Sequence, residues 1–367
     1  MTNQPAPPPS SHRQPAPPPS SHRLPLLPTT VVGSYSVPEW LERLKTDFYL
    51  HRISPAHLEE IHDVAIKAAI KDQEQAGIDV VSDGELRRDN DIDYLLSRIP
   101  GVSITNATKS YYYDYFEAEV AEPLPFGDTA ALGLVEDFVF TRSQTERPIK
   151  FSFTGPFSLS RRIRSKANSE PGALVRALAH ALNAEAKELV AAGATRLQID
   201  EPFLAGSPDQ VGLAVEAINI VTDGVEADWA LHVCYGNRYA RPSWEGHYDF
   251  LFPAVLEAEV GTLVLEFARK GYGDLALFSR FPWRRRLGLG VIDVKSQDVE
   301  SSDVVAGRIR KALEVVPAEL LVVNPDCGLR HLPAATARAK LRSMVAGTAA
   351  VRREVAGTSV SPPAAGG

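Results

Sequence analysis

The chain has 367 residues, of which 44% are hydrophobic and 23% charged, and this globular composition excludes wholesale disorder. A formal net charge of -7 argues against a protein that binds nucleic acid or anionic membranes, which normally has a basic surface. No stretch approaches the roughly 20 continuous apolar residues of a membrane helix, and the N-terminus lacks the apolar core of a secretory signal. We therefore expect a cytoplasmic protein.

Both ends of the chain differ from its middle. The decapeptide QPAPPPSSHR occurs at 4–13 and again at 14–23. Proline blocks the hydrogen bonds of helices and strands, so we expect residues 1–28 to be an extended, disordered tail. The small and proline-rich residues 356–367 predict a second tail. One folded domain, residues 29–355, is left between them.

Eight short apolar or β-branched runs alternate with longer helical patterns in the middle of the chain. The predicted strands are 29–35, 78–85, 149–156, 195–202, 228–236, 262–268, 286–293 and 320–328. Helical spacing of apolar residues is clear at 57–77, 173–193 and 299–316. This pattern predicts an α/β fold, a (β/α)8 TIM barrel, with a doubly wound sheet as the alternative.

The stretch from residue 86 to residue 148 is too long for a simple crossover between the second and third strands. We expect it to be an insertion in the barrel. Within it, the tyrosine-rich residues 111–120 predict an exposed hairpin or lid.

Unusual polar residues cluster at the C-terminal ends of the predicted strands, which form the active-site mouth of a barrel. An aspartate after a strand often caps the next helix instead, an alternative that applies equally to Asp83 and Asp326. The candidates at the strand ends are Ser34, Asp83, Glu85, Thr154, Asp200, Glu201, His232, Cys234, Glu266, Asp293, Lys295, Asp326 and Cys327.

The pair His232 and Cys234 is the sharpest of these features. Residues two apart on a strand point to the same face, so imidazole and thiol would enter the mouth together. Glu266 ends the next predicted strand and Cys327 the last. Two cysteines, a histidine and a carboxylate match the ligand preference of zinc, although a buried histidine and cysteine are also common in ordinary strands.

Several motifs together resemble one known family. QIDEP, LHVCYGN, LEFA, GLGVIDVKS and VNPDCGLR are similar to the catalytic barrel of cobalamin-independent methionine synthase, and TTVVGSY and SDGELRRDN fit the same family. The likeness spans about residues 29–353. It implies methyl transfer to the thiol of homocysteine and a Zn²⁺ ion on His232, Cys234, Glu266 and Cys327. It also implies that Glu85 and Asp200 hold the amino group of homocysteine and that its carboxylate lies near Ser34.

The chain departs from the full-length enzymes of this family in two respects. It has room for one barrel where they have two, and Lys295 stands where they have a histidine that serves as proton donor to the folate leaving group. We expect Asp293 and Lys295 to be catalytic. The methyl donor is either 5-methyltetrahydrofolate or a methylcorrinoid such as methylcobalamin, free or on a corrinoid protein, as in the short core-type methionine synthases that this sequence resembles.

Two other functions compete with this interpretation. A related zinc barrel can activate a different thiol, for example by opening an epoxide with coenzyme M. A non-catalytic barrel with a structural zinc ion is the other alternative. The presence of both Glu85 and Asp200 favours an amino-acid thiol, because coenzyme M has no ammonium group to bind.

Overall fold

The computed structural model describes residues 24–105, 109–124, 132–166, 170 and 172–358. The decapeptide repeats and residues 359–367 lie outside these ranges, so the expected tails are for the most part not described. The described chain starts earlier and ends later than the predicted domain, since Leu27 is fully buried and helix α10 extends beyond residue 355. Among the described helices, none has the length and apolarity that a membrane crossing requires.

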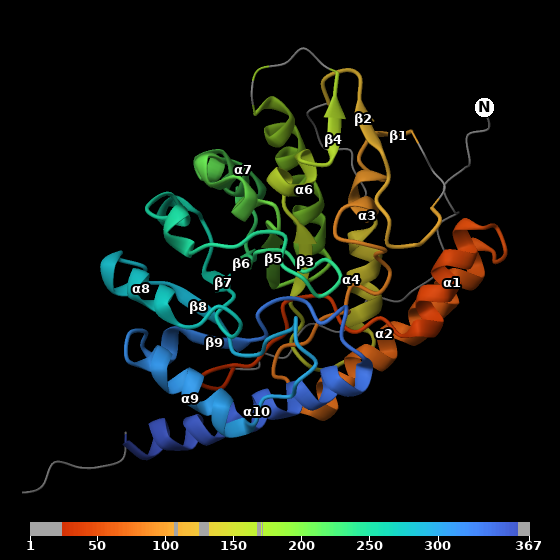
Figure 1. The fold of residues 1–367 in the computed structure, drawn as a ribbon. Coiled ribbons are helices and arrows are strands. Elements are labelled where there is room, and N and C mark those ends of the chain that lie inside the picture. Colours follow the sequence, from red (N-terminus) through yellow and green to blue (C-terminus); the bar gives the residue numbers. More distant parts are fainter. Residues whose placement is uncertain (1–23, 106–108, 125–131, 167–169, 171, 359–367) are drawn as a thin grey trace, which may run out of the picture.

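Six strands form one parallel sheet in the order β3-β5-β6-β7-β8-β9, and helices surround it (Figure 1). Its strands are β3 (Phe151–Thr154), β5 (Arg196–Asp200), β6 (Asp228–Val233), β7 (Thr262–Leu265), β8 (Arg286–Gly290) and β9 (Leu321–Asn324). Each lies within a predicted strand. The prediction of an α/β fold with a parallel sheet is thereby confirmed.

The α-helices of the described chain are α1 (Glu39–Tyr49), α2 (Pro55–Ala76), α3 (Asp93–Leu96), α4 (Leu134–Arg142), α5 (Pro156–Ser160), α6 (Ala173–Ala191), α7 (Val211–Thr222), α8 (Ala276–Arg280), α9 (Ser302–Leu313) and α10 (Ala334–Thr358). Short 3₁₀ helices are η1 (Leu204–Gly206), η2 (Pro208–Gln210), η3 (Tyr248–Leu251), η4 (Ala254–Glu257), η5 (Gly273–Leu275) and η6 (Ala318–Leu320). The three predicted helices correspond to α2, α6 and α9.

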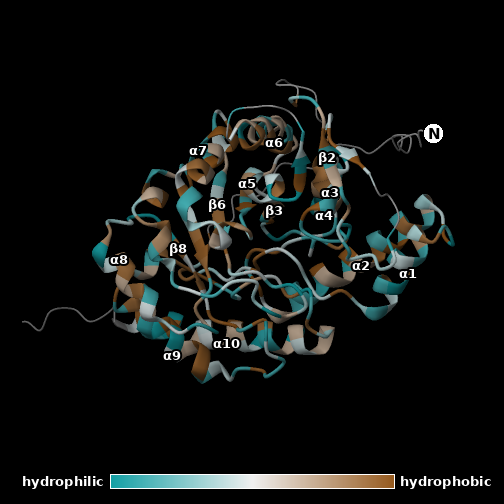
Figure 2. Ribbon diagram, turned by 45° about the horizontal axis from the view of Figure 1, so that its top comes forward, coloured by the Kyte–Doolittle hydropathy of each residue, from teal (hydrophilic) through white to brown (hydrophobic). Residues whose placement is uncertain are grey.

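Local sequence explains where helix α2 begins and ends. The Ser54 side chain accepts a hydrogen bond from the backbone N–H of His57, and Pro55 occupies the first helical position. The helix ends at Gly77, whose φ of 91° is a left-handed conformation that glycine adopts without strain. Figure 2 shows hydrophobic and hydrophilic residues side by side along surface helices such as α8 and α9.

Side chains alternate between the two faces of the sheet. Leu197, Leu231 and Leu263 belong to the main hydrophobic core, which also includes apolar residues of the helices. The neighbouring positions Ala230 and Val264 belong to a separate small cluster on the other face. His232 is on the same face as Ala230 and Val264. The helices pack against the opposite face, which carries Leu197, Leu231 and Leu263.

The first two predicted strands appear as isolated bridges. Thr29 pairs with Val323 of β9, Thr30 with Val80, and Val81 with Ile149, all in parallel. Side chains replace part of the expected ladder, because the Asp79 carboxylate accepts from the Thr29 backbone N–H at 2.8 Å. The two segments thus lie side by side between β9, at one edge of the six-stranded sheet, and Ile149, which precedes β3 at the other edge.

Residues 86–148 contain α3, α4 and two strands of a second sheet. Strand β1 (Ser103–Ile104) pairs antiparallel with β2 (Ala118–Val120), which pairs in parallel with β4 (Ile163–Ser165). The expectation that 111–120 is an exposed hairpin or lid is wrong at two of its four tyrosines. Tyr112 and Tyr113 are buried, because Tyr112 Oη donates to Glu42 at 3.1 Å and the Tyr113 ring packs against His331.

One buried hydroxyl joins the ends of β6 and β7. Tyr248 is fully buried; its Oη donates to the Val233 carbonyl at 2.9 Å and accepts from the Glu266 N–H at 3.0 Å. Replacing Tyr248 with Phe leaves two buried backbone groups without this partner. We expect the free energy of unfolding to fall by about 2 kcal/mol or more, measured by urea denaturation. The exposed Tyr239→Phe is the control and should change it by less than about 0.5 kcal/mol; equal curves for both variants would contradict this role.

Candidate metal and substrate site

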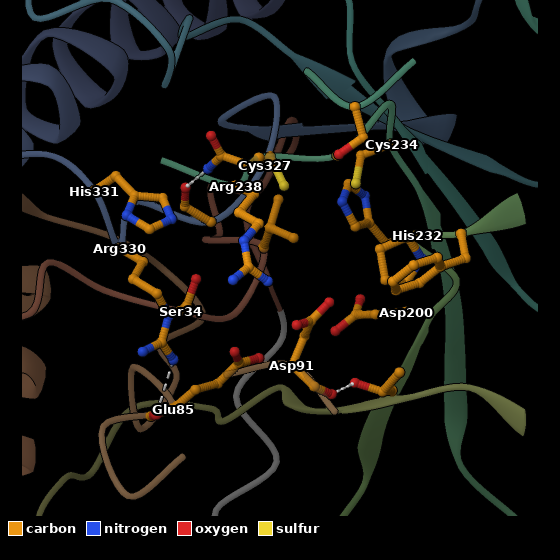
Figure 3. A pocket seen from close by; sticks show the side chains of 18 of the residues that line it. Ser34, Glu85, Asp91, Asp200, His232, Cys234, Arg238, Cys327, Arg330 and His331 are labelled. Carbon is orange, nitrogen blue, oxygen red and sulfur yellow. Dashed lines mark hydrogen bonds between the residues drawn. The ribbon is translucent and has the colours of Figure 1, made fainter. Parts of the chain in front are cut away.

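A cavity of about 500 Å³ lies at the C-terminal ends of the strands (Figure 3). Of the nine residues that were given a metal, substrate or catalytic role, six line it: Ser34, Glu85, Asp200, His232, Cys234 and Cys327. The other three, Glu266, Asp293 and Lys295, do not. The structure therefore brings the predicted substrate residues and three of the four predicted metal ligands to one cavity.

His232, Cys234 and Cys327 meet at one point of the cavity wall. One ligand atom from each lies within 4.8 Å of the others, and all three residues are buried. Both cysteines are free thiols. His232 and Cys234 come from β6 and the residue after it, whereas Cys327 follows β9. Two sulfurs and an imidazole nitrogen at this separation fit the ligand set of a zinc ion.

The tautomer of His232 is set by a backbone carbonyl. Its Nδ1 lies 3.1 Å from the carbonyl oxygen of Val264, which can only accept, so Nδ1 carries the proton. Nε2 is buried and has no hydrogen-bond partner within the described part of the chain. A buried nitrogen lone pair costs free energy unless it is bonded, and metal-binding histidines have this arrangement. The histidine is thus preset as a ligand through Nε2.

The three side chains perturb one another electrostatically. The hydrogen bond to Cys234, together with burial, raises the pKa of the Cys327 thiol well above its ordinary value. Burial lowers the pKa of His232, but the Cys327 sulfur and the carboxylates of Asp200 and Glu266 more than offset it, so the pKa lies above its ordinary value. A divalent cation would favour the deprotonated thiols that burial disfavours.

Glu266 and Lys295 form an ion pair beside this cluster. Lys295 Nζ lies 2.9 Å from Glu266 Oε1, and the two side chains are 4% and 0% exposed. The Asp293 carboxylate accepts from the Lys295 backbone N–H at 2.8 Å, and the Asp293 N–H donates to Glu300 at 2.7 Å. Asp293 thus shapes the turn that carries Lys295.

Asp326 holds the loop that follows Glu266. Its Oδ1 accepts from the backbone N–H groups of Phe267 and Ala268 at 2.9 and 2.8 Å, and its Oδ2 accepts from that of Arg269 at 2.9 Å. A Cβ atom at Gly290 would lie only 2.2 Å from Oδ1, so a glycine is needed there. Asp326 does more than cap a following helix, which was the alternative for it: it ties the end of β9 to the end of β7.

Glu85 and Asp200 supply the acidic part of the cavity. Glu85 has a φ of 54°, a strained conformation for a non-glycine residue, and its Oε1 accepts from Ser152 Oγ at 2.6 Å. Asp200 accepts from Gln198 Nε2 at 2.7 Å, and Gln198 in turn accepts from the buried Lys150 Nζ at 2.5 Å. Burial, followed by the charge of Glu85, raises the pKa of Asp200 to about 7, although His232 opposes this.

Comparisons with known proteins agree with this geometry. Residues 27–350 match the family model of the cobalamin-independent synthase catalytic domain. The chain belongs to this family. The methionine synthases of Saccharolobus solfataricus and Sulfurisphaera tokodaii are 36% and 33% identical, each over 90% of this chain and over 96% and 94% of their own lengths. A B12-independent methionine synthase from Shewanella sp. W3-18-1, solved in complex with selenomethionine, superposes with a TM-score of 0.78 at 27% identity, covering 90% of this chain and 99% of that one.

Membership of the cobalamin-independent methionine synthase family makes this chain an S-methyltransferase. Its cavity also contains residues that the sequence did not predict. Asp91, Tyr113, Tyr115, Arg330 and His331 all line the cavity. Arg330 stands in the CGLR motif three positions after Cys327, which was a usable signal. The sequence has no such signal for the tyrosines, because their region was expected to be exposed.

The anchoring role of Asp326 in this family member can be tested with graded variants. Asp326→Ala leaves three backbone N–H groups without this acceptor, so we expect the free energy of unfolding to fall by about 3 kcal/mol or more. Asp326→Asn keeps one oxygen and should lose less. Urea denaturation of both variants measures the difference. An alanine variant that is no less stable than the asparagine variant would show that the loop is held elsewhere.

Proposed function

We propose that this protein is a zinc-dependent methyltransferase that moves a methyl group to the thiol of homocysteine and forms methionine. The observation that carries the proposal is the meeting of two thiols and one free imidazole nitrogen within 4.8 Å, in a cavity that also holds Glu85 and Asp200. Family membership supports it, and so does the Shewanella relative, whose selenomethionine is an analogue of the proposed product.

His232, Cys234 and Cys327 would hold the zinc ion, with Glu266 as a fourth and exchangeable ligand. A free thiol with a pKa of about 8.5 is only about 3% thiolate at pH 7. Bound zinc supplies an electrophilic centre that favours the thiolate form of a sulfur ligand. We place the reaction in the cytoplasm, where thiols are kept reduced.

The remaining residues of the cavity would orient the amino acid. Glu85 and Asp200 would bind the ammonium group of homocysteine, and Ser34 would lie near its carboxylate. A methyl transfer requires the sulfur, the methyl carbon and the leaving group to be in line, and fixing the amino acid at two points restricts the thiol to one approach. The acids therefore contribute by alignment and not by chemistry at the sulfur.

The methyl donor would enter past Tyr113, Tyr115 and Arg238, which line the cavity. Arg238 lies 4.3 Å from the centre of the Tyr115 ring and 5.4 Å from that of Tyr113. Flat aromatic and guanidinium faces suit the planar part of either donor, 5-methyltetrahydrofolate or a methylcorrinoid. Asp293 and Lys295, which we expected to be catalytic, do not line this cavity. We therefore assign them to the positioning of Glu266 and not to proton transfer.

We also propose that the parallel sheet is part of a closed (β/α)8 barrel. The bridges of Thr29–Thr30 and Val80–Val81 support this, because two further strands at these segments would complete a ring from β9 to β3. In this arrangement residues 86–148 are an insertion between the second and third strands. The cavity would then occupy the C-terminal mouth of the barrel.

The proposed function predicts methionine formation by the zinc-loaded full chain. Homocysteine is offered separately with methyltetrahydrofolate, its polyglutamate and methylcobalamin, and methionine is quantified by mass spectrometry. We expect product with at least one donor, loss of activity after chelation, and recovery on adding Zn²⁺. Coenzyme M replaces homocysteine in a parallel series. Alkylation of coenzyme M without methionine formation would overturn the proposal in favour of the alternative thiol.

The roles of the two acids can be separated from metal binding. Losing one partner of a buried charge pair costs about 2 kcal/mol or more, so Glu85→Gln and Asp200→Asn should each raise the KM for homocysteine about 30-fold or more. Zinc content should stay near that of the wild type. The control substrate is a homocysteine analogue without the amino group, whose KM should change far less. Loss of zinc from either variant would mean that the division between metal and substrate residues is wrong.

A further inference from the structure

The two oxygens of the Glu266 carboxylate have different surroundings. Oε1 accepts from Lys295 Nζ at 2.9 Å and from the backbone N–H of Tyr235 at 3.3 Å. Oε2 is buried and has no hydrogen-bond partner among the residues that the structure describes. One oxygen is therefore saturated while the other is free to take a ligand.

This carboxylate lies next to the thiol and imidazole cluster. Glu266 follows β7, which pairs in parallel with β6, and it accepts from the residue that directly follows Cys234. The charge of Glu266 helps to raise the pKa of His232, and the charges of Glu266 and both cysteines raise the pKa of Lys295. Glu266 is nevertheless not one of the three residues whose ligand atoms lie within 4.8 Å of one another. It therefore occupies a position close to the cluster but outside its tightest group.

A buried ion pair of this kind needs an explanation other than stability. Burying two charges costs desolvation free energy that their attraction seldom exceeds, and an apolar pair of similar volume is often as stable. Neither side chain lines the cavity, so the pair does not contact a substrate there. The position of the pair beside the cluster points to a task directed at the cluster itself.

We propose that Lys295 makes Glu266 the exchangeable ligand of the metal, by holding Oε1 while Oε2 joins or leaves the coordination shell. If the thiolate of homocysteine took the place of Oε2, the carboxylate would keep its counter-ion and no unpaired charge would be left buried. This inference rests on the proposed function, and it gives Lys295 a role that does not require contact with the methyl donor.

The charges support the exchange. Two thiolates, one carboxylate and the Lys295 ammonium sum to -2, which a divalent ion reduces to zero. Addition of one further thiolate then leaves -1. Without the ammonium the same site would start at -1 and reach -2 in a buried environment, which disfavours entry of the thiolate. Lys295 thus lowers the electrostatic cost of substrate binding and weakens the hold of Glu266 on the metal.

The experiment compares the ligands and affinities of four variants of the full chain. They are Lys295→Met, Lys295→Arg, Glu266→Gln and the double variant Glu266→Gln with Lys295→Met. Zinc K-edge absorption counts sulfur ligands with and without homocysteine, calorimetry gives homocysteine affinity, and competition with a chromophoric chelator gives zinc affinity. Circular dichroism checks that each variant is folded.

In the wild type we expect one light ligand to be replaced by a sulfur when homocysteine binds. Lys295→Met should keep its oxygen ligand, bind homocysteine about tenfold or more weakly, and bind zinc more tightly. Lys295→Arg keeps the cation and should resemble the wild type. In the Glu266→Gln background, Lys295→Met should weaken homocysteine binding less than it does alone, because the carboxylate that Lys295 holds is gone and only the effect of its charge remains.

Two results would overturn the inference. One is an unchanged zinc and homocysteine affinity in Lys295→Met, and the other is an equal effect of this substitution in the Glu266→Gln background. Failure of the proposed function is a separate result, in which the zinc-loaded wild type binds no homocysteine. The zinc affinity of Lys295→Met still decides the inference in that case, because it does not depend on the substrate.

Discussion

The site depends on the parallel register between β6 and β7. In this register His232 is paired with Val264, and the carbonyl of Val264 accepts the proton of His232 Nδ1. The same hydrogen-bond ladder places Cys234 and Glu266 one step further along, at the ends of adjacent strands. A shift of one residue would turn the imidazole and the thiol to the helix-covered face. The backbone ladder therefore determines both which atoms meet and which nitrogen is free.

Supports outside the cluster keep the strand ends in place. The Tyr248 hydroxyl connects the end of β6 to the start of the loop after β7, and Asp326 connects that loop to the end of β9. Each is a buried side chain whose hydrogen bonds named here go to backbone groups, so each fixes the position of the backbone around the cluster. Cys234, Glu266 and Cys327 consequently share one rigid frame, although long stretches of sequence separate them.

The sequence predicted the parts of this site that follow from periodicity. Alternation along a strand is local, so His232 and Cys234 could be placed on one face, and the parallel arrangement placed Cys327 near them. The distance of Glu266 from the tightest group and its pairing with Lys295 could not be predicted, because they depend on loop conformations that have no repeat. The same holds for Tyr113, whose burial involves contacts with distant residues such as His331.

The charges of Glu266 and Asp200 are compensated in two unequal ways, and this inequality matches the proposed tasks of the two acids. Glu266 has a direct lysine partner at 2.9 Å. Asp200 reaches the buried Lys150 only through Gln198, and burial lowers the pKa of that lysine to about 8 despite the pull of Asp200 and Glu85. Of the two acids proposed to bind the ammonium group, Asp200 is thus the one left short of positive charge, since Glu85 Oε1 lies 3.4 Å from the guanidinium of Arg88. A carboxylate that must leave a metal is better served by a permanent counter-ion, whereas a carboxylate such as Asp200, which must attract a substrate cation, is better served by a more distant one.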